Sequence, residues 1–431
     1  MAMDLNKNIR ERCHVNSNDE GDSFVGVKAD TDDAVIYFPV GYSLPENDER
    51  LREDINNLFN VLAKFMKEDK VIEQSKFAAP RTVDFPMHAY LTVIRDYLRF
   101  KRYYVESETS FRTDTKGITS WPKTIKEQRG LVQKNGSLIY LNQTVRENTP
   151  NFNKKITQIH RYCVYEAFDK MGWFYVPYMP ERPGPHPEGK EAISIIMQRL
   201  SSTHNDIEQV LLKAMLHMLE YQDQKNYEKQ YFFGTDFFER VWEKMVDKAF
   251  GNANKELYLP KAEWHLDYGR FDKRKTPALQ PDSIMLYEDK VYVLDSKLYR
   301  YGIYPRPEYL PGAPDINKQI TYGEFIETTK GISSDRIYNA FIMPFNKDDN
   351  LFGHMDENGE FISDIQGNYG NIGEAIGKWR PNTKKYERIQ GIVVDTRHLM
   401  YNYLTIARSE EDQASLRAAI EKVDTRGPVT T

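Results

Sequence analysis

The sequence predicts a mixed α/β sheet flanked by helices in the C-terminal half of the chain, preceded by an α+β N-terminal domain. The order of apolar patterns in that half supports this fold class. Two segments have apolar residues at helical spacing, and each is followed by short runs rich in β-branched and aromatic residues. In chain order the patterns predict a helix at 237–250, a hairpin at 284–294, a helix at 315–328, and strands at 337–345 and 389–394. Helices alternating with strands are typical of a sheet covered by helices.

Length and composition limit the class of protein. At 431 residues the chain is long enough for two or more domains, and 40% hydrophobic with 29% charged residues is ordinary for a soluble protein. The net charge of −5 excludes a grip on DNA by overall positive charge, so any nucleic-acid surface must be a local patch. Cys13 and Cys163 lack Cys or His neighbours at metal-ligand spacing, which indicates a reducing compartment and no zinc site. Without a signal pattern or an apolar run near ~20 residues, the expected location is the cytoplasm, with no membrane contact.

The N-terminal region begins with a polar stretch, residues 1–21, for which we predict no regular element. After it, two strand-like runs around a polar break predict a hairpin, and apolar residues at helical spacing predict two helices. These elements are strands at 24–27 and 34–38 and helices at 47–68 and 88–102.

Five prolines between residues 177 and 189 predict a linker, because proline removes a backbone donor and fixes φ. A helix is expected beyond it, over 191–221. The expected domains are an N-terminal DNA- or partner-binding domain, a catalytic domain, and a C-terminal helix with a polar tail, at 1–190, 191–408 and 409–431.

Two local basic clusters are candidate DNA-binding surfaces. The first lies in an extended pattern over 111–146 and includes Lys123 and Lys126, with Trp121 as a stacking group. The second precedes the last predicted strand and includes Lys384 and Lys385. The alternative for both clusters is an ordinary solvated face, with Trp121 buried.

The hairpin at 284–294 organises the prediction of function. If Glu288 and Asp289 form a two-residue turn, the register places Asp282 opposite Asp295. Opposed residues lie about 4.5–5.5 Å apart at Cβ, so two like charges there need neutralisation. Lys297 shares the face of Asp295, because side chains alternate along a strand. A longer turn would shift the register by one residue and send the two acids to opposite faces.

Opposed carboxylates predict a divalent cation. Asp282, Asp295 and the carbonyl of Ser296 suit Mg²⁺, which prefers oxygen ligands and keeps several waters. Lys297 beside such an ion can orient the attacking water, take its proton if its own pKa is lowered, or offset charge on the transition state. The alternative is an ordinary edge hairpin with solvated acids.

The residues Pro281-Asp282 and Asp295-Ser296-Lys297 resemble the Pro-Asp…(Asp/Glu)-x-Lys signature of the PD-(D/E)xK nuclease superfamily. Gln319 and Tyr322 resemble the Gln-x-x-Tyr element of some members. The resemblance implies a restriction-endonuclease-like fold and a Mg²⁺-dependent deoxyribonuclease, in which Mn²⁺ can substitute. It implies that Asp282 and Asp295 hold the metal, that Lys297 assists the water, and that Gln319 and Tyr322 position the DNA strand or the lysine.

In such nucleases the helix before the hairpin often supplies a third acid. Glu243, in the helix predicted over 237–250, is the candidate metal ligand, and Glu239 and Glu263 are its rivals. Glu243 lies off the apolar stripe of that helix, so a solvated glutamate is the alternative.

A wider resemblance covers much of the chain. The Trp242-Glu243-Lys244-Met245 helix, the Asp-Ser-Lys strand, and the strand patterns at 340–344 and 391–396 are similar to the LlaJI-type restriction endonucleases. These are related to the McrC-like nuclease subunits of McrBC systems, which work with a separate GTP-hydrolysing AAA+ protein, McrB. The implied partners are double-stranded DNA and a McrB-like GTPase, in a dimer or a larger complex.

The residues exclude an NTPase site on this chain, because the run 373–379 has the wrong glycine spacing for a phosphate loop and places Trp379 where Ser or Thr binds Mg²⁺. The expected function is therefore a Mg²⁺-dependent DNA endonuclease of a bacterial restriction system. Two alternatives remain, a self-sufficient Type II restriction enzyme and a non-catalytic scaffold subunit with a nuclease-like fold.

Overall fold

A computed structural model gives the fold of most of the chain. It describes residues 9–29, 34–68, 86–223, 231–265, 267, 273–275 and 277–425. The chain forms two compact units. Of the described residues, 86–223 belong to the first, called unit 1, and the others to the second, called unit 2.

The predicted hairpin lies in unit 2 as strands β12 (Ser283–Tyr287) and β13 (Lys290–Ser296). Its register is confirmed, since Leu286 pairs with Val291 and the ladder continues to Ser283 opposite Leu294. Glu288 and Asp289 form the turn, and Glu288 has a positive φ of 52°. A two-residue turn of this kind matches the twist of its strands and fixes the register that the acids require.

The hairpin is one edge of a five-stranded sheet with the order β12-β13-β14-β18-β17. The other strands are β14 (Ile337–Phe345), β17 (Tyr369–Ile376) and β18 (Arg388–Asp395). β13, β14 and β18 run parallel, whereas both edge strands are antiparallel to their neighbours. Every residue of β14 is buried, as expected for a central strand with both faces covered. The expected mixed α/β sheet is therefore confirmed.

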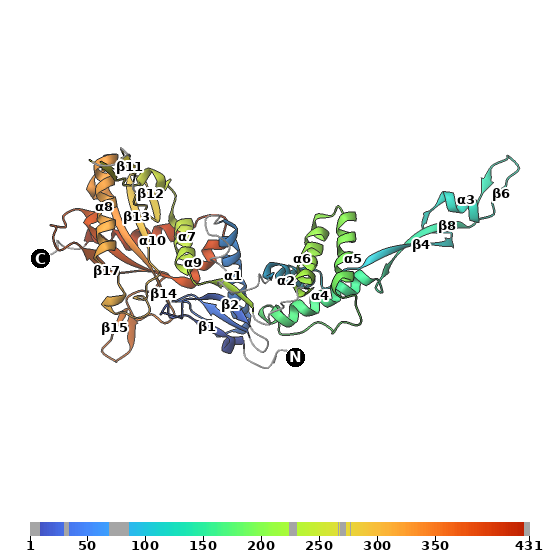
Figure 1. The fold of residues 1–431 in the computed structure, drawn as a ribbon, viewed down its shortest axis with the longest axis horizontal. Coiled ribbons are helices and arrows are strands. Elements are labelled where there is room, and N and C mark those ends of the chain that lie inside the picture. Colours follow the sequence, from blue (N-terminus) through green and yellow to red (C-terminus); the bar gives the residue numbers. More distant parts are fainter. Residues whose placement is uncertain are drawn as a thin grey trace. The chain divides into compact units, whose positions relative to one another are not determined.

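Helices cover this sheet (Figure 1). α8 (Ala313–Lys330) contacts β13, β14 and β18, and α7 (Phe238–Phe250) contacts β12 and β13. Val291 and Val293 of β13 pack in one apolar cluster with Ile320, Tyr322 and Ile326 of α8. Further along the chain are α9 (Thr396–Leu404) and α10 (Glu410–Ile420), which begins at the expected cap, Ser409.

Unit 2 also contains a second sheet, with the order β1-β3-β2-β9, and helix α1 (Asp48–Glu68). The predicted hairpin is present as β2 (Val25–Ala29) and β3 (Ala34–Phe38), joined by β1 (Cys13–Val15) and β9 (Tyr231–Thr235). β1 follows a short 3-10 helix (Ile9–Arg12), so the prediction of no regular element over 1–21 is wrong for these residues. Backbone pairing with β3 stabilises β1 although the stretch around it is polar.

Unit 1 is built from α2 (Met87–Phe100), α4 (Lys155–Met171), α5 (Gly189–Ser202) and α6 (Asp206–Asp223). The single helix expected over 191–221 is wrong. The helix breaks at 203–205, where the side chain of Asn205 accepts hydrogen bonds from the amides of Ile207 and Glu208 and starts α6. The proline-rich segment before α5 lies within unit 1 and does not separate the two units.

The structure thus divides the chain elsewhere than at the expected boundaries, 190 and 408. Residues 9–29 and 34–68 belong to unit 2 with the hairpin, and α5 and α6 belong to unit 1. α10 packs on β17 and so belongs to the body of unit 2. Pairing between strands far apart in the sequence, as between β2 and β9, does not change the amino-acid composition at the boundary between the units.

A two-stranded ribbon extends from the helices of unit 1 (Figure 1). It is formed by β4 (Glu106–Asp114) and β8 (Gln143–Asn151), paired along their whole length. We call the segment 106–151 the arm. Its other elements are β5 (Ile118–Thr119), α3 (Trp121–Glu127), β6 (Leu131–Val132) and β7 (Leu138–Ile139). The expected extended pattern is wrong at α3, which Pro122 starts in its first turn.

Short elements complete unit 2. They are β10 (Glu263–His265) with β11 (Lys273–Lys275), and β15 (Gly353–Met355) with β16 (Phe361–Ser363). Among the described residues, no helix combines the length and apolar composition needed to cross a bilayer.

Candidate active site

The two predicted acids meet at the open end of the hairpin. Asp295 is fully buried near the end of β13, and Asp282 lies just before β12. The backbone amide of Ser296 donates a 2.8 Å hydrogen bond to Oδ2 of Asp282. The Oδ2 atom of Asp282 is thereby held against the strand that carries Asp295, as the predicted register requires.

Two lysines neutralise Asp295. Lys297 Nζ lies 2.8 Å from its Oδ2, and Lys318 Nζ, from α8, lies 3.3 Å from its Oδ1. Lys297 also forms an ion pair with Asp315, 2.8 Å from Oδ1, in the first turn of α8. Alternation along β13 explains the arrangement, because it directs Val291, Val293 and Asp295 to the face that α8 covers.

Burial and mutual repulsion shift the acids toward protonation. Burial, and then the charge of Asp295, raise the pKa of Asp282 to about 6. Burial, and then the charges of Asp282, Asp295 and Glu239, raise the pKa of Glu243 to about 7. The Glu243 side chain thus lies within electrostatic range of both aspartates, although it lies off the apolar stripe of α7. The charges of these carboxylates therefore act on one another, which makes this end of the hairpin a candidate functional site.

The pKa of Lys297 is raised as well, which for a lysine favours the charged form. Burial alone would lower its pKa, but the charges and hydrogen bonds of Asp295 and Asp315 outweigh burial and raise the pKa above its ordinary value. The ammonium is therefore protonated at neutral pH. This favours orientation of water or stabilisation of charge over acceptance of a proton.

α8 brings Gln319 and Tyr322 to the same region, and both side chains are buried. Within the described part of the chain, neither atom of the Gln319 amide nor the Tyr322 hydroxyl has a hydrogen-bond partner. Burial, and then the charges of Asp295 and Asp282, raise the pKa of Tyr322 above its ordinary value. Unpaired buried polar groups are costly, so groups of this kind beside acids indicate a site that binds something polar.

A cavity of about 520 Å³ opens beside Asp282. α7 contributes Glu239 and Glu243 to its lining, and the basic side chains that line it are Arg240, Lys244 and Lys255. Glu263, the other rival of Glu243, lies outside this lining and pairs with His265 at 2.9 Å. In the described ranges, no group of three or more His, Cys, Asp or Glu side chains is arranged to hold a metal ion.

The four candidate DNA-binding lysines fall into two groups. Lys123 and Lys126 lie on α3 in the arm, where Lys123 Nζ sits 3.6 Å from the centroid of the Phe111 ring. Lys384 and Lys385 lie in unit 2 and form ion pairs with Glu327 at 2.6 Å and Asp424 at 2.8 Å. Trp121 is 53% exposed, so the alternative of a buried tryptophan is wrong.

Sequence reasoning missed the roles of Asp315 and Lys318. Both lie on the predicted helix, one turn apart and next to Gln319, and that spacing is the only signal for them in the sequence. Their contacts with Lys297 and Asp295 depend on how α8 docks on β13.

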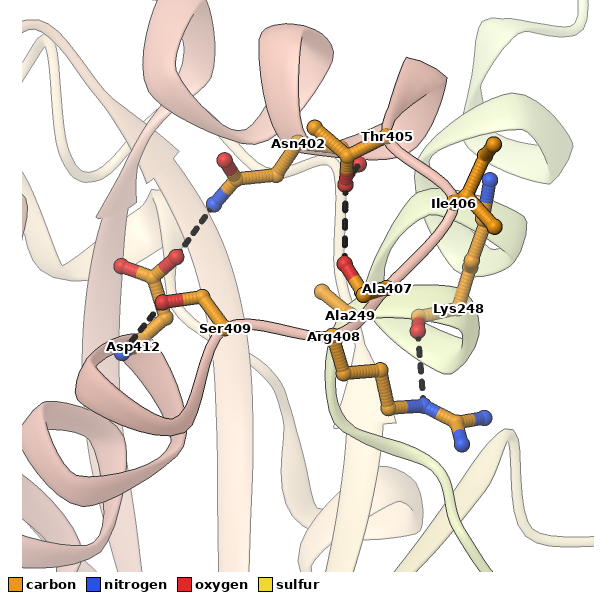
Figure 2. A pocket seen from close by; sticks show the side chains of 9 residues that line it. All are labelled: Lys248, Ala249, Asn402, Thr405, Ile406, Ala407, Arg408, Ser409 and Asp412. Carbon is orange, nitrogen blue, oxygen red and sulfur yellow. Dashed lines mark hydrogen bonds between the residues drawn. The ribbon is translucent and has the colours of Figure 1, made fainter.

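Another cavity, of about 320 Å³, lies where α7 ends and the loop from α9 to α10 passes it. Figure 2 shows its polar groups bonded to one another: Asn402 donates to Asp412 at 2.6 Å, and Arg408 Nε donates to the carbonyl of Lys248 at 2.9 Å. None of the predicted site residues lines it. We assign this cavity to the packing of the loop.

Three comparisons relate the chain to known proteins. It is 24% identical over 352 residues to the Type II restriction enzyme BsuMI component YdjA of Bacillus subtilis (strain 168), covering 77% of this chain and 74% of that one. A chain of the solved assembly of Thermococcus gammatolerans McrB AAA+ hexamers with bound McrC aligns at 10% identity with a TM-score of 0.35, covering 93% of this chain and 83% of that one.

The family comparison covers most of the chain, including the hairpin with both acids, α7, and all of α8. The model of the LlaJI restriction endonuclease family matches residues 24–367. The protein therefore belongs to the LlaJI restriction endonuclease family.

Proposed function

We propose that the protein is a Mg²⁺-dependent DNA endonuclease whose PD-(D/E)xK site lies at the open end of the β12–β13 hairpin. One observation carries the proposal: Asp282, Asp295 and Lys297 converge there, with Ser296 bonded to Asp282 at 2.8 Å and Lys297 to Asp295 at 2.8 Å. Membership of a restriction endonuclease family supports hydrolysis of DNA as the reaction. The cavity of about 520 Å³ beside Asp282 offers basic side chains at the approach to the acids.

Asp282 and Asp295 supply two carboxylates, as a partly hydrated Mg²⁺ requires, although the described residues form no cluster of three acids around one point. Asp282, Asp295, the carbonyl of Ser296 and Glu243 would hold it, because they supply the hard oxygen ligands that Mg²⁺, or Mn²⁺ in its place, prefers. The raised pKa values of Asp282 and Glu243 support this, since a cation would relieve the repulsion that raises them. When bound, the metal would activate water and neutralise charge on the phosphate.

The chain's own residues supply the rest of the chemistry. Lys297, protonated and held between Asp295 and Asp315, would orient the attacking water and offset charge on the pentavalent phosphorus. The unpaired Gln319 amide and Tyr322 hydroxyl would hydrogen-bond the strand or Lys297. Water attacks phosphorus and the bond to O3′ breaks, so the cut leaves a 5′-phosphate and a 3′-hydroxyl.

Unit 1 would contact a partner. The arm exposes apolar side chains that a soluble monomer has no reason to leave in water, and they gather around α3 and the short strands β5 to β7. They are Ile118, Trp121, Ile125, Leu131, Val132, Leu138 and Leu141. The relative YdjA is named as one component of a restriction enzyme. We propose a separate AAA+ GTPase as the occupant of this surface, with Lys123 and Lys126 free for DNA.

The test is cleavage of unmodified and methylated plasmid with Mg²⁺, with and without host extract and GTP. Wild type is compared with K297A and with K290A, which removes a lysine of the same strand that pairs instead with Glu421 at 2.9 Å. We expect Mg²⁺-dependent cutting that K297A loses and K290A keeps.

The outcomes separate the alternatives. Dependence on extract and GTP supports a motor-coupled nuclease, and cutting without them indicates a self-sufficient Type II enzyme. If no condition gives cleavage and calorimetry detects no Mg²⁺ binding that D295A abolishes, the chain is a scaffold subunit and the proposal fails.

A further inference from the structure

Both carboxylate oxygens of Asp295 lie within ion-pair distance of a lysine. Oδ2 faces Lys297 Nζ at 2.8 Å, and Oδ1 faces Lys318 Nζ at 3.3 Å. Asp295 is 0% exposed, so these two lysines rather than bulk water balance its charge in the described structure. A cation that binds this carboxylate must therefore compete with two ammonium groups for the same charge.

The two lysines are not equally easy to displace. Lys297 is held by Asp315 as well, at 2.8 Å, so it can leave Asp295 and stay in the site. Among the described residues Lys318 has no second carboxylate within ion-pair distance, although its charge also acts on Asp282, and its Nζ lies 5.7 Å from the centroid of the Tyr322 ring. Its side chain is 30% exposed, twice the 15% of Lys297, so its ammonium can return to water at lower cost.

We propose that Lys318 and the divalent metal compete for Asp295, and that the displaced Lys318 then binds a DNA phosphate beside the cleavage point. This inference rests on the proposed nuclease function. A released ammonium next to the acids is a compact point charge, which is how lysine binds phosphate. Lys318 thus occupies the acid while DNA is absent and contributes to substrate binding once the metal is present.

Competition between Lys318 and the metal predicts that removing this lysine strengthens Mg²⁺ binding and weakens DNA binding. K318Q should bind Mg²⁺ more tightly than wild type in the absence of DNA, by roughly threefold to tenfold, because a competing ion pair is gone. The same variant should bind a short double-stranded oligonucleotide more weakly, with a salt slope lower by about one, since one phosphate contact is lost. The measurements are calorimetry with Mg²⁺ alone, and DNA binding with Ca²⁺ in place of Mg²⁺ to prevent cutting.

Two control variants separate competition from a general change of charge. K255Q removes a lysine that donates to the backbone carbonyl of Asp282 at 3.0 Å, so it lowers the charge of the site without freeing an oxygen of Asp295. K330Q removes a lysine at the far end of α8, where Nζ lies 5.6 Å from the Tyr258 ring. K318Q should tighten Mg²⁺ binding more than K255Q, and K330Q should change neither measurement. Thermal melting in EDTA checks that each variant is folded.

The outcomes distinguish this inference from the function on which it rests. If wild type binds no Mg²⁺, the proposed nuclease site is wrong. If wild type binds Mg²⁺ but K318Q binds it no more tightly than K255Q does, Lys318 does not compete for Asp295. If K318Q keeps the DNA affinity and salt slope of wild type, Lys318 does not bind phosphate.

Discussion

The backbone amide of Ser296 and the carboxylate of Asp282 are joined by a 2.8 Å hydrogen bond, although 14 residues separate them in the sequence. The bond closes the open end of the β12–β13 hairpin, opposite the turn at Glu288 and Asp289. A shift of one residue in the register would remove it and would turn Asp295 to the other face of the sheet. The length of the turn thus sets the register, and the register decides whether the two acids lie side by side.

The turn can be improved without touching the site. Glu288 has a φ of 52°, a conformation that glycine adopts without strain, so E288G should raise the free energy of unfolding by roughly 0.5–1 kcal/mol. Urea unfolding measures the change. D289G is the matched control and should not stabilise, because Asp289 pairs with Arg336 at 2.7 Å. Equal effects of the two variants would contradict the assignment of strain to Glu288.

Two buried tyrosines in one cluster should respond differently to loss of the hydroxyl. Tyr322 has an unpaired hydroxyl, so Y322F should leave the free energy of unfolding unchanged or slightly higher. Tyr386 donates to Glu327 at 2.6 Å, so Y386F should lower it by about 1 kcal/mol.

The rate of DNA cleavage should be affected more by Y322F than by Y386F, the reverse of their effects on stability. Y322F should lose about tenfold or more in rate, as expected for loss of a hydrogen bond to a charged group, and Y386F little. Denaturant unfolding and plasmid cleavage on the same preparations check this. A Y322F variant that is destabilised as much as Y386F would show that the hydroxyl has a structural partner.

Glu243 should make the stability of the metal-free protein depend on pH. Its pKa is about 7 in the folded chain against an ordinary 4.5, so the folded state binds the proton more tightly than the unfolded state. Stability therefore falls as pH rises from about 4.5 to about 7. The E243Q variant has no carboxylate at this position and so does not lose stability in this way. Above this pH range, in EDTA, its free energy of unfolding should exceed that of wild type by up to about 2 kcal/mol.

Binding of Mg²⁺ should have the opposite pH dependence and become stronger as pH rises, because a cation favours the ionised form of Glu243. Wild-type affinity for Mg²⁺ should rise through the same pH window, and E243Q should show a shallower rise. Thermal unfolding and calorimetry across pH test both statements. E308Q, which removes an exposed glutamate elsewhere in unit 2, should follow wild type in both, and a parallel profile for E243Q would remove Glu243 from the site.

The two basic clusters should contribute differently to DNA binding. Replacing Lys123 and Lys126 with glutamine should lower the salt slope of DNA affinity by about one to two, because lysines that contact phosphate release counterions. Replacing Lys384 and Lys385 should leave the slope unchanged and cost about 0.5–1 kcal/mol of stability, since both are engaged with acids of the same unit. Salt titrations and unfolding curves measure these effects, and a reduced slope in the second variant would restore that cluster as a DNA surface.

Local patterns predicted much of unit 2 correctly. The apolar, β-preferring runs at 284–287 and 291–294 and the two polar residues between them predicted the hairpin and its register, and helical spacing located α1, α7 and α8 within a few residues. These predictions succeed because turn geometry and amphipathic periodicity are properties of neighbouring residues.

Other features failed for identifiable reasons. The break between α5 and α6 depends on capping by Asn205, a short polar side chain inside an otherwise helical pattern. β1 is a strand because β3 offers it backbone partners. The division into units depends on β9 pairing with β2, about 200 residues away along the chain, and composition carries no record of such pairing.

The sequence by itself predicted that, given a two-residue turn, Asp282 would lie opposite Asp295 and Lys297 would share the face of Asp295, because the period of a strand is two residues. Only the tertiary structure decided which groups neutralise them. Docking of α8 on β13 brings Lys318 and Asp315 to the acids, and docking of α7 brings Glu243 within range of both. Contacts between two elements depend on how their surfaces pack, and the residue pattern within one element does not specify which residues of another element it will meet.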